Sequence, residues 1–158
     1  LAIKNASGNI FNGTLANGSI GTLSITKSGA GTMSLTGLNT YTGSTTVTQG
    51  ILQLNRTGGS TLPSGNSVSV SGMGSVLRIS SDQTLNNVTL STGGKLQVDA
   101  GVTLTITGTY NPATCFVQND GTIRLQGSAL QNFPGTNASV ISMNNLTINN
   151  AFGVNLNK

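Results

Sequence analysis

Residues 50–55 read Gly-Ile-Leu-Gln-Leu-Asn, and residues 94–99 repeat the pattern as Gly-Lys-Leu-Gln-Val-Asp, 44 positions later. A second echo, Asn-Asn-Val-Thr-Leu at residues 86–90 and Asn-Asn-Leu-Thr-Ile at residues 144–148, has an offset of 58. Both offsets are near multiples of about 20 residues, as in a chain that stacks similar coils. Within each echo, apolar and polar residues alternate with period 2, which is typical of a strand with one buried face.

The same alternation recurs along the chain. Pairs of apolar residues around one polar residue indicate short strands, and turn dipeptides such as Asn12-Gly13 and Asp120-Gly121 separate them. Some gaps between pairs are about twice the others, so Thr45–Val47 and Cys115–Val117 are predicted to fill two missing strands. The predicted strand pairs are Leu23/Ile25, Met33/Leu35, Leu52/Leu54, Val68/Val70, Leu77/Ile79, Val88/Leu90, Leu96/Val98, Leu104/Ile106, Ile123/Leu125, Leu146/Ile148 and Val154/Leu156.

These patterns predict an all-β fold. An antiparallel sandwich has no need of self-similarity at multiples of one length, whereas a solenoid builds each coil from the same unit. We therefore predict a single-stranded parallel β-helix (β-solenoid) of about seven or eight coils of roughly 20 residues. No change in composition divides the chain, so residues 1–158 form one predicted domain. Residues 111–115 and 131–137 are predicted to be irregular loops.

The composition supports this class. Gly, Asn, Ser and Thr make up 82 of the 158 residues, and these residue types disfavour helix interiors. Only 6% of residues are charged, against about a quarter in an average domain. The longest apolar runs are two or three residues, which is too short for a membrane span. In stacked coils a repeated charge would repel itself, whereas stacked Asn, Ser and Thr side chains hydrogen-bond to one another.

The charges do not indicate a nucleic-acid partner. The net charge is +4, but the seven Lys and Arg residues are scattered and aromatic residues are few, whereas nucleic-acid sites combine a basic patch with stacking side chains. Cys115 is the single cysteine. We expect it to pack as a small apolar residue, with an intermolecular disulfide as the alternative.

Residues 21–55 closely resemble the autotransporter-associated β-strand repeat. The resemblance rests on a Lys-x-Gly-x-Gly motif, a Gly-x-Asn-x-Tyr-x-Gly turn and a Gly-x-Leu-x-Leu strand, although Thr46 and Val47 are adjacent here where the family spaces them by one. It implies a right-handed parallel β-helix of the passenger type found in bacterial surface proteins, where such regions act as stalks, adhesins and spacers. The matching residues are Lys27, Gly29, Gly31, Leu35, Gly37, Asn39, Tyr41, Gly43, Thr46, Val47, Gly50, Leu52 and Leu54.

The sequence offers little for catalysis. It lacks His and Glu, and its acids are Asp82, Asp99 and Asp120, which lie 17 and 21 residues apart. Those spacings are near one coil, so Asp99 and Asp120 are weak candidates for a shared cation site, with turn residues as the alternative. We predict no enzyme activity, no catalytic residues and no cofactor.

The predicted function is a structural or adhesive segment of an extracellular bacterial surface protein. We expect either continuation in a longer chain or end-to-end self-association into a filament, through end residues Leu1, Ile3, Val154 and Leu156. A host or glycan surface is a further expected partner. Two alternatives stay open: a polysaccharide-binding or polysaccharide-acting β-helix, and an ice-binding solenoid that uses outward Thr rows such as Thr103, Thr105 and Thr107.

Overall fold

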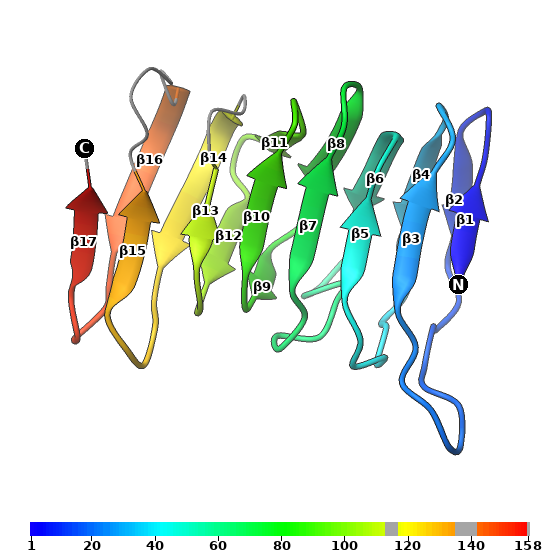
Figure 1. The fold of residues 1–158 in the computed structure, drawn as a ribbon, viewed down its shortest axis with the longest axis horizontal. Coiled ribbons are helices and arrows are strands. Elements are labelled where there is room, and N and C mark those ends of the chain that lie inside the picture. Colours follow the sequence, from blue (N-terminus) through cyan, green and yellow to red (C-terminus); the bar gives the residue numbers. More distant parts are fainter. Residues whose placement is uncertain (113–116, 135–141, 158) are drawn as a thin grey trace.

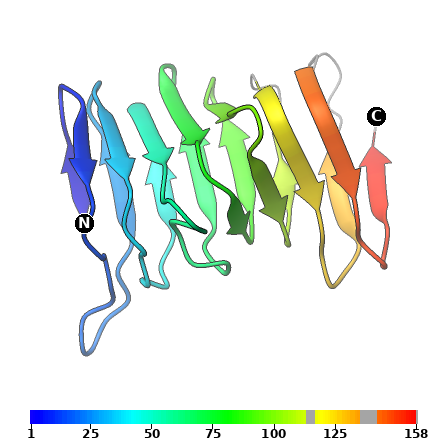
Figure 2. The same cartoon turned by 180° about the vertical axis from the view of Figure 1, so that it is seen from behind.

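The chain is a right-handed coil of parallel strands (Figure 1). The computed structural model describes residues 1–112, 117–134 and 142–157. Within these ranges every strand pair is parallel, no helix occurs, and the chain makes about seven turns. The nearer strands in Figure 1 run upward and the farther strands run downward as the chain advances from right to left, and Figure 2 shows the same hand from behind. The predicted β-solenoid is therefore confirmed over the sandwich.

Two long sheets and one short sheet form the walls of the coil. The first sheet has the order β1 (Ala2–Lys4), β3 (Ile25–Ser28), β5 (Thr45–Val47), β7 (Val68–Ser71), β10 (Val88–Ser91) and β13 (Tyr110–Asn111). The second sheet comprises β2 (Asn9–Phe11), β4 (Thr32–Leu35), β6 (Gly50–Leu54), β8 (Ser75–Ile79), β11 (Lys95–Val98), β14 (Val117–Leu125), β12 (Thr103–Ile106) and β9 (Gln83–Leu85), with β16 (Ser142–Ile148) paired to β14. The short third sheet pairs β15 (Gln131–Pro134) with β17 (Val154–Asn157).

The coils differ in length although they share one register. Paired residues lie from 19 positions apart, as for Thr32 and Ile51, to 25 positions apart, as for Gly50 and Ser75. The long strand β14 pairs with both β11 and β12. It therefore joins the two halves of the second sheet, and the extra residues of the longer coils go into the turns.

Columns of identical or similar side chains fill the interior. Leu52, Leu77, Leu96 and Val117 succeed one another in register and each is fully buried. Burial of one such side chain stabilises the fold by about 1.5–3 kcal/mol. The predicted inward positions in strands from Ile25 to Leu125 are confirmed, including Val47 of β5, except that Met33 of β4 is only partly buried. The hydrophobic core is thus one continuous column along the coil.

Several sequence predictions need correction. Gln131–Pro134 is a strand rather than a loop, because its backbone pairs with Val154–Asn157. Asn111 likewise ends strand β13, and Leu23 lies before the strand that begins at Ile25. Strand β9 was missed because the polar Gln83 takes its first inward position. Cys115, for which we expect either apolar packing or an intermolecular disulfide, lies outside the described residues.

Close approach between coils explains the glycines that begin the echoed segments. Gly50 has a φ of 68°, and a Cβ there would collide with the carbonyl oxygens of Gly29 and Gly31 in the preceding coil. A Cβ at Gly94 would collide with the carbonyl oxygen of Val70. The Gly-x-Leu-x-apolar pattern is therefore a steric requirement of stacking, since only glycine lets the backbones approach so closely.

Two buried tyrosines differ in how their hydroxyl groups are satisfied. The Tyr41 hydroxyl lies 2.6 Å from Thr45 Oγ1, which donates to Asn66 Oδ1 at 2.8 Å, and Asn66 Nδ2 donates to the Gly43 carbonyl at 2.7 Å. The Tyr110 ring packs edge-on against Phe133, with ring centroids 5.3 Å apart. Its hydroxyl is buried without a hydrogen-bond partner among the described residues. Burial raises the pKa of both hydroxyls.

We expect Gly94→Ala to lower the free energy of unfolding by about 1–3 kcal/mol, because the methyl group must displace the backbone of the preceding coil. Gly65→Ala is the matched control, since nothing lies within 4 Å of a Cβ at Gly65. Urea unfolding followed by circular dichroism measures both variants. Equal stability of the two would contradict close stacking at Gly94.

We expect Tyr41→Phe to lower the free energy of unfolding by about 1 kcal/mol, because it breaks a buried hydrogen bond, whereas Tyr110→Phe should be neutral or stabilising. Urea unfolding at neutral pH tests this pair. A Tyr110→Phe loss as large as that of Tyr41→Phe would contradict the unpartnered state of the Tyr110 hydroxyl.

The tyrosines also predict alkaline sensitivity. Above pH 10 the unfolded chain loses phenolic protons that the folded chain keeps, so stability falls as pH rises. The lowered pKa of Lys27 acts in the opposite direction, but only below its ordinary value of 10.5. The melting temperature should therefore fall above about pH 10.5, and less steeply in Tyr110→Phe. Parallel curves for the variant and the parent chain would exclude this contribution.

Candidate functional site

The lysine of the repeat motif closes a turn. Lys27 takes an inward position in register with Val47 and is fully buried. Its Nζ donates to the carbonyl oxygen of Gly29 at 2.7 Å and to that of Gln49, one coil further, at 3.0 Å. Burial lowers the pKa of this ammonium group. Lys27 therefore links two successive turns and is not available to a ligand.

The asparagine of the motif has a similar role at another corner. Asn39 Oδ1 accepts a hydrogen bond from the Leu15 amide at 2.9 Å, and Asn39 Nδ2 donates to the Thr61 carbonyl at 3.0 Å. It thus bridges three successive coils. Buried glutamines do the same further along: Gln83 Oε1 accepts from the Thr61 amide at 2.9 Å, and Gln131 Nε2 donates to the Gly108 carbonyl at 2.6 Å.

Asp99 and Asp120 are the two candidate cation ligands. They directly follow Val98 and Asn119, which pair with each other on neighbouring strands. Asp99 forms an ion pair with Arg78, whose Nε lies 3.1 Å from both carboxylate oxygens, and it accepts a bond from Ser80 Oγ at 2.6 Å. Asp120 is exposed and accepts a bond from Gln118 at 3.0 Å. In the described ranges no three His, Cys, Asp or Glu side chains gather. A cation at Asp99 would have to displace Arg78 and Ser80.

Of the predicted end residues, Ile3 lies on β1, Val154 and Leu156 lie on β17, and Leu1 directly precedes β1. Leu1 is exposed, whereas Ile3 and Val154 pack partly against the core. Leu156 lies on β17, opposite Phe133 in the register. At the same end of the coil, Leu146 and Ile148 of β16 remain 39% and 48% exposed, although the residues they pair with, Ile123 and Leu125, are buried.

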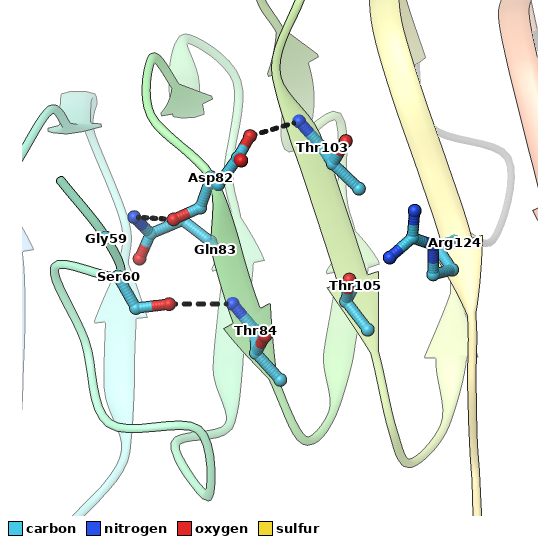
Figure 3. A pocket seen from close by; sticks show the side chains of 8 residues that line it. All are labelled: Gly59, Ser60, Asp82, Gln83, Thr84, Thr103, Thr105 and Arg124. Carbon is cyan, nitrogen blue, oxygen red and sulfur yellow. Dashed lines mark hydrogen bonds between the residues drawn. The ribbon is translucent and has the colours of Figure 1, made fainter.

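A groove on the second sheet collects charged and hydroxyl side chains (Figure 3). It has a volume of about 340 Å³ and lies over β9, β12 and β14. Its lining residues are Gly59, Ser60, Asp82, Gln83, Thr84, Thr103, Thr105 and Arg124.

The register of the coils brings these side chains together. Thr84, Thr105 and Arg124 succeed one another on paired strands at outward, half-buried positions. In Figure 3 the Arg124 guanidinium points toward the strand that carries Thr103 and Thr105, and Asp82 lies beyond that strand.

Hydrogen bonds hold the opposite rim of the groove. The Thr103 amide donates to Asp82 Oδ1 at 2.8 Å, and the Thr84 amide donates to Ser60 Oγ at 3.0 Å. Asp82 itself is exposed. The rim therefore offers a carboxylate of fixed position beside hydroxyl groups.

Sequence reasoning did not identify this groove. Asp82 and Arg124 lie 42 positions apart in the sequence, and no local pattern links them. The available signal was the spacing of 21 and 19 residues that separates Thr84, Thr105 and Arg124, about one coil each. When the coils are aligned at every position, Arg124 falls in a row of threonines. The apolar strand pairs alone do not show this, because they describe only the inward positions.

The outward rows of the two sheets differ in composition. On the first sheet the outward residues Thr26, Thr46, Ser69 and Thr89 stack in register. On the second sheet Ile10, Ser34, Gln53, Arg78 and Gln97 stack in register, and Ser34 is buried. The outward faces therefore mix hydroxyl, amide and charged groups.

Comparison with known proteins agrees with this architecture. The family model of the passenger-associated transport repeat matches residues 25–54. The chain is 32% identical over 138 residues to the adhesin BmaC autotransporter of Brucella suis biovar 1 (strain 1330), an alignment that covers 87% of this chain. The chain spans 4% of the length of that relative. No solved structure matches significantly.

These matches confirm the resemblance that the sequence motifs indicated. The matched segment contains the glycine, lysine, asparagine and tyrosine positions whose contacts are described above. Within the described residues, no helix has the length and hydrophobicity that a membrane span requires. Residues 25–54 therefore match the passenger-associated transport repeat, and they belong to a β-solenoid whose sequence is similar to part of an autotransporter adhesin.

Proposed function

We propose that this chain is an adhesin-like passenger segment displayed outside a bacterial cell, and that it acts by presenting its outer faces rather than by catalysis. The observation that supports this proposal is that inward and outward residues have different roles. The polar groups of motif residues such as Lys27 and Asn39 already form hydrogen bonds between coils. Contact with a partner is then left to the outward rows of the sheets.

Similarity supports the surface location and the adhesive role. The repeat that matches residues 25–54 is described as passenger-associated, and the relative is described as an adhesin and an autotransporter. A stack of parallel coils also suits a stalk, because each coil contacts only its neighbours and the length of the rod scales with their number.

The groove favours binding over hydrolysis. Glycoside hydrolases use two carboxyl groups that flank the scissile bond. Asp82 is the one carboxylate among the residues that line the described groove. A polysaccharide-acting enzyme is therefore the less supported alternative, and the weak candidate cation site at Asp99 and Asp120 and the ice-binding face stay predictions.

Adhesion can be tested with beads coated with the purified chain. We expect saturable, fold-dependent attachment of these beads to epithelial cell layers, because the ordered outer faces supply the contacts. Leu52→Asp is the control, since a carboxylate in the buried column should unfold the coil. Attachment that is no greater than that of Leu52→Asp beads would overturn the adhesive role, and release of sugars from polysaccharides would overturn the non-enzymatic one.

Self-association is a separate part of the proposal. Leu146 and Ile148 are in register with the buried Ile123 and Leu125 but are themselves exposed. A further coil, either of the same chain or of a second copy, would cover them. We expect light scattering over a concentration series to show growth, and electron microscopy to show rods. Leu146→Asn should abolish the growth if β16 is the interface. A concentration-independent monomer would exclude end-to-end assembly of this segment.

A further inference from the structure

Arg124 has an unusual place among the three arginines of the chain. Arg78 pairs with Asp99, and Arg56 donates to the Ser60 carbonyl at 3.4 Å. In the part of the chain that the structure describes, the Arg124 guanidinium has no hydrogen bond or ion pair, although it is half-buried in the groove. A guanidinium that is not neutralised by its own chain is suited to a planar anion, above all a carboxylate, which it binds through two parallel hydrogen bonds.

Asp82 supplies complementary chemistry on the opposite rim. The Thr103 amide holds its Oδ1 atom at 2.8 Å, and its Oδ2 atom has no hydrogen bond within the described ranges. An ionised carboxylate oxygen accepts hydrogen bonds, so it can take the hydroxyl groups of a ligand. Thr103 and Thr105 lie between the two charged groups, and Thr84 lies on the Asp82 side of the groove. Their hydroxyl groups can both donate and accept hydrogen bonds.

The spacing explains why the two charges do not neutralise each other. Asp82 directly precedes β9, Arg124 lies on β14, and β12 lies between them. By the register Asp82 is level with Thr103 and Thr122, so the backbone of Arg124 lies two strands across and two residues further along, about 12 Å away. No ion pair joins them in the described structure, where the pair of Arg78 and Asp99 is the one found. A sugar ring that carries a carboxylate on one side and hydroxyls on the other spans such a gap.

The composition of the groove selects an acidic ligand over a neutral one. Neutral glycans are commonly held by stacking on aromatic rings, and no aromatic residue lines this groove. A phosphate-rich ligand is also disfavoured, because Asp82 would repel it and Arg124 is the single cation of the lining. The volume of about 340 Å³ lies at the lower end of small-ligand sites, which are about 300–1,000 Å³.

We propose that the groove between β9, β12 and β14 binds a carboxylate-bearing sugar residue of an acidic polysaccharide. The sugar carboxylate lies against Arg124, and ring hydroxyls donate to Asp82 and exchange hydrogen bonds with the threonines. This inference rests on the proposed adhesive function and names the class of ligand for one face of the rod. One groove of this size binds weakly, so adhesion by the whole surface depends on many copies acting together.

Titration of the full chain, followed by nuclear magnetic resonance and calorimetry, tests the proposal. The probes are an oligogalacturonate and sialyllactose, which present carboxylates of different sugars, and a neutral malto-oligosaccharide. We expect saturable binding of at least one acidic probe, shifts confined to the amides around Thr84, Thr103 and Thr105, and no binding of the neutral probe. Absence of binding by both acidic probes would overturn the proposal.

Variants then assign the binding to the groove. Arg124→Gln should weaken binding about tenfold or more, and Asp82→Asn about threefold to tenfold. Lys4→Gln is the matched control, because it removes one positive charge from the exposed β1, on the other sheet. Equal loss in Lys4→Gln and Arg124→Gln would indicate general charge attraction and overturn the site.

The two proposals fail in different ways. If the parent chain attaches to cells but binds neither acidic probe, the adhesive role holds and the groove assignment is wrong. If the acidic probes bind but coated beads do not attach, the groove holds and the adhesive role is wrong. Circular dichroism of Arg124→Gln guards against misfolding, and the absence of an intramolecular partner in the described structure predicts a parent-like spectrum.

Discussion

The hydrogen bonds of each strand go to the strands of the neighbouring coils, and the rest of the structure depends on this. Val68, Val88 and Tyr110 illustrate it, because each is paired with the equivalent residue one coil away. A coil cannot satisfy its own backbone, so it is stable only in register with a neighbour. The register then superposes side chains, which builds the buried columns and makes repeated charges costly. The 6% charged content follows from that superposition.

The corners of the coil pose a different problem. Where the chain turns between sheets, carbonyl and amide groups lose their strand partners close to the core, and unpaired buried polar groups are destabilising. Lys27, Asn39, Gln83 and Gln131 supply the missing bonds at several of these corners. The repeat motif is therefore a description of corner chemistry and close packing. It identifies the architecture of the solenoid and does not by itself identify a ligand.

Function is left to the positions that stacking does not constrain. Outward residues between buried neighbours can change without disturbing the column, so an exception in an outward row carries information. Arg124 is such an exception in a row that otherwise holds Thr84, Thr105 and Thr147. Arg78 is another, but Asp99 in the next coil neutralises it. Arg78 is therefore part of a structural ion pair, whereas Arg124 is a candidate binding group.

The sequence by itself determined the class of fold and most of the core. Alternation in segments such as Leu52/Leu54 and Leu77/Ile79 specified which side chains are buried, because period 2 is a local property of a strand. The glycines and the echoes of Gly50–Asn55 specified stacking. Local pattern failed where a polar residue occupies an inward position, as Gln83 does, or where a strand has little apolar alternation, as in Gln131–Pro134.

Only the tertiary structure decided which distant residues meet. The coils vary from 19 to 25 residues, so spacing along the chain does not specify the neighbour of a given side chain. Asp82 lies beside Thr103 and faces Arg124 across a groove, whereas Asp99 meets Arg78. The physical reason is that turns absorb the extra residues while hydrogen bonds between coils set the register. The lateral order of side chains is therefore a property of the stack and not of the sequence interval.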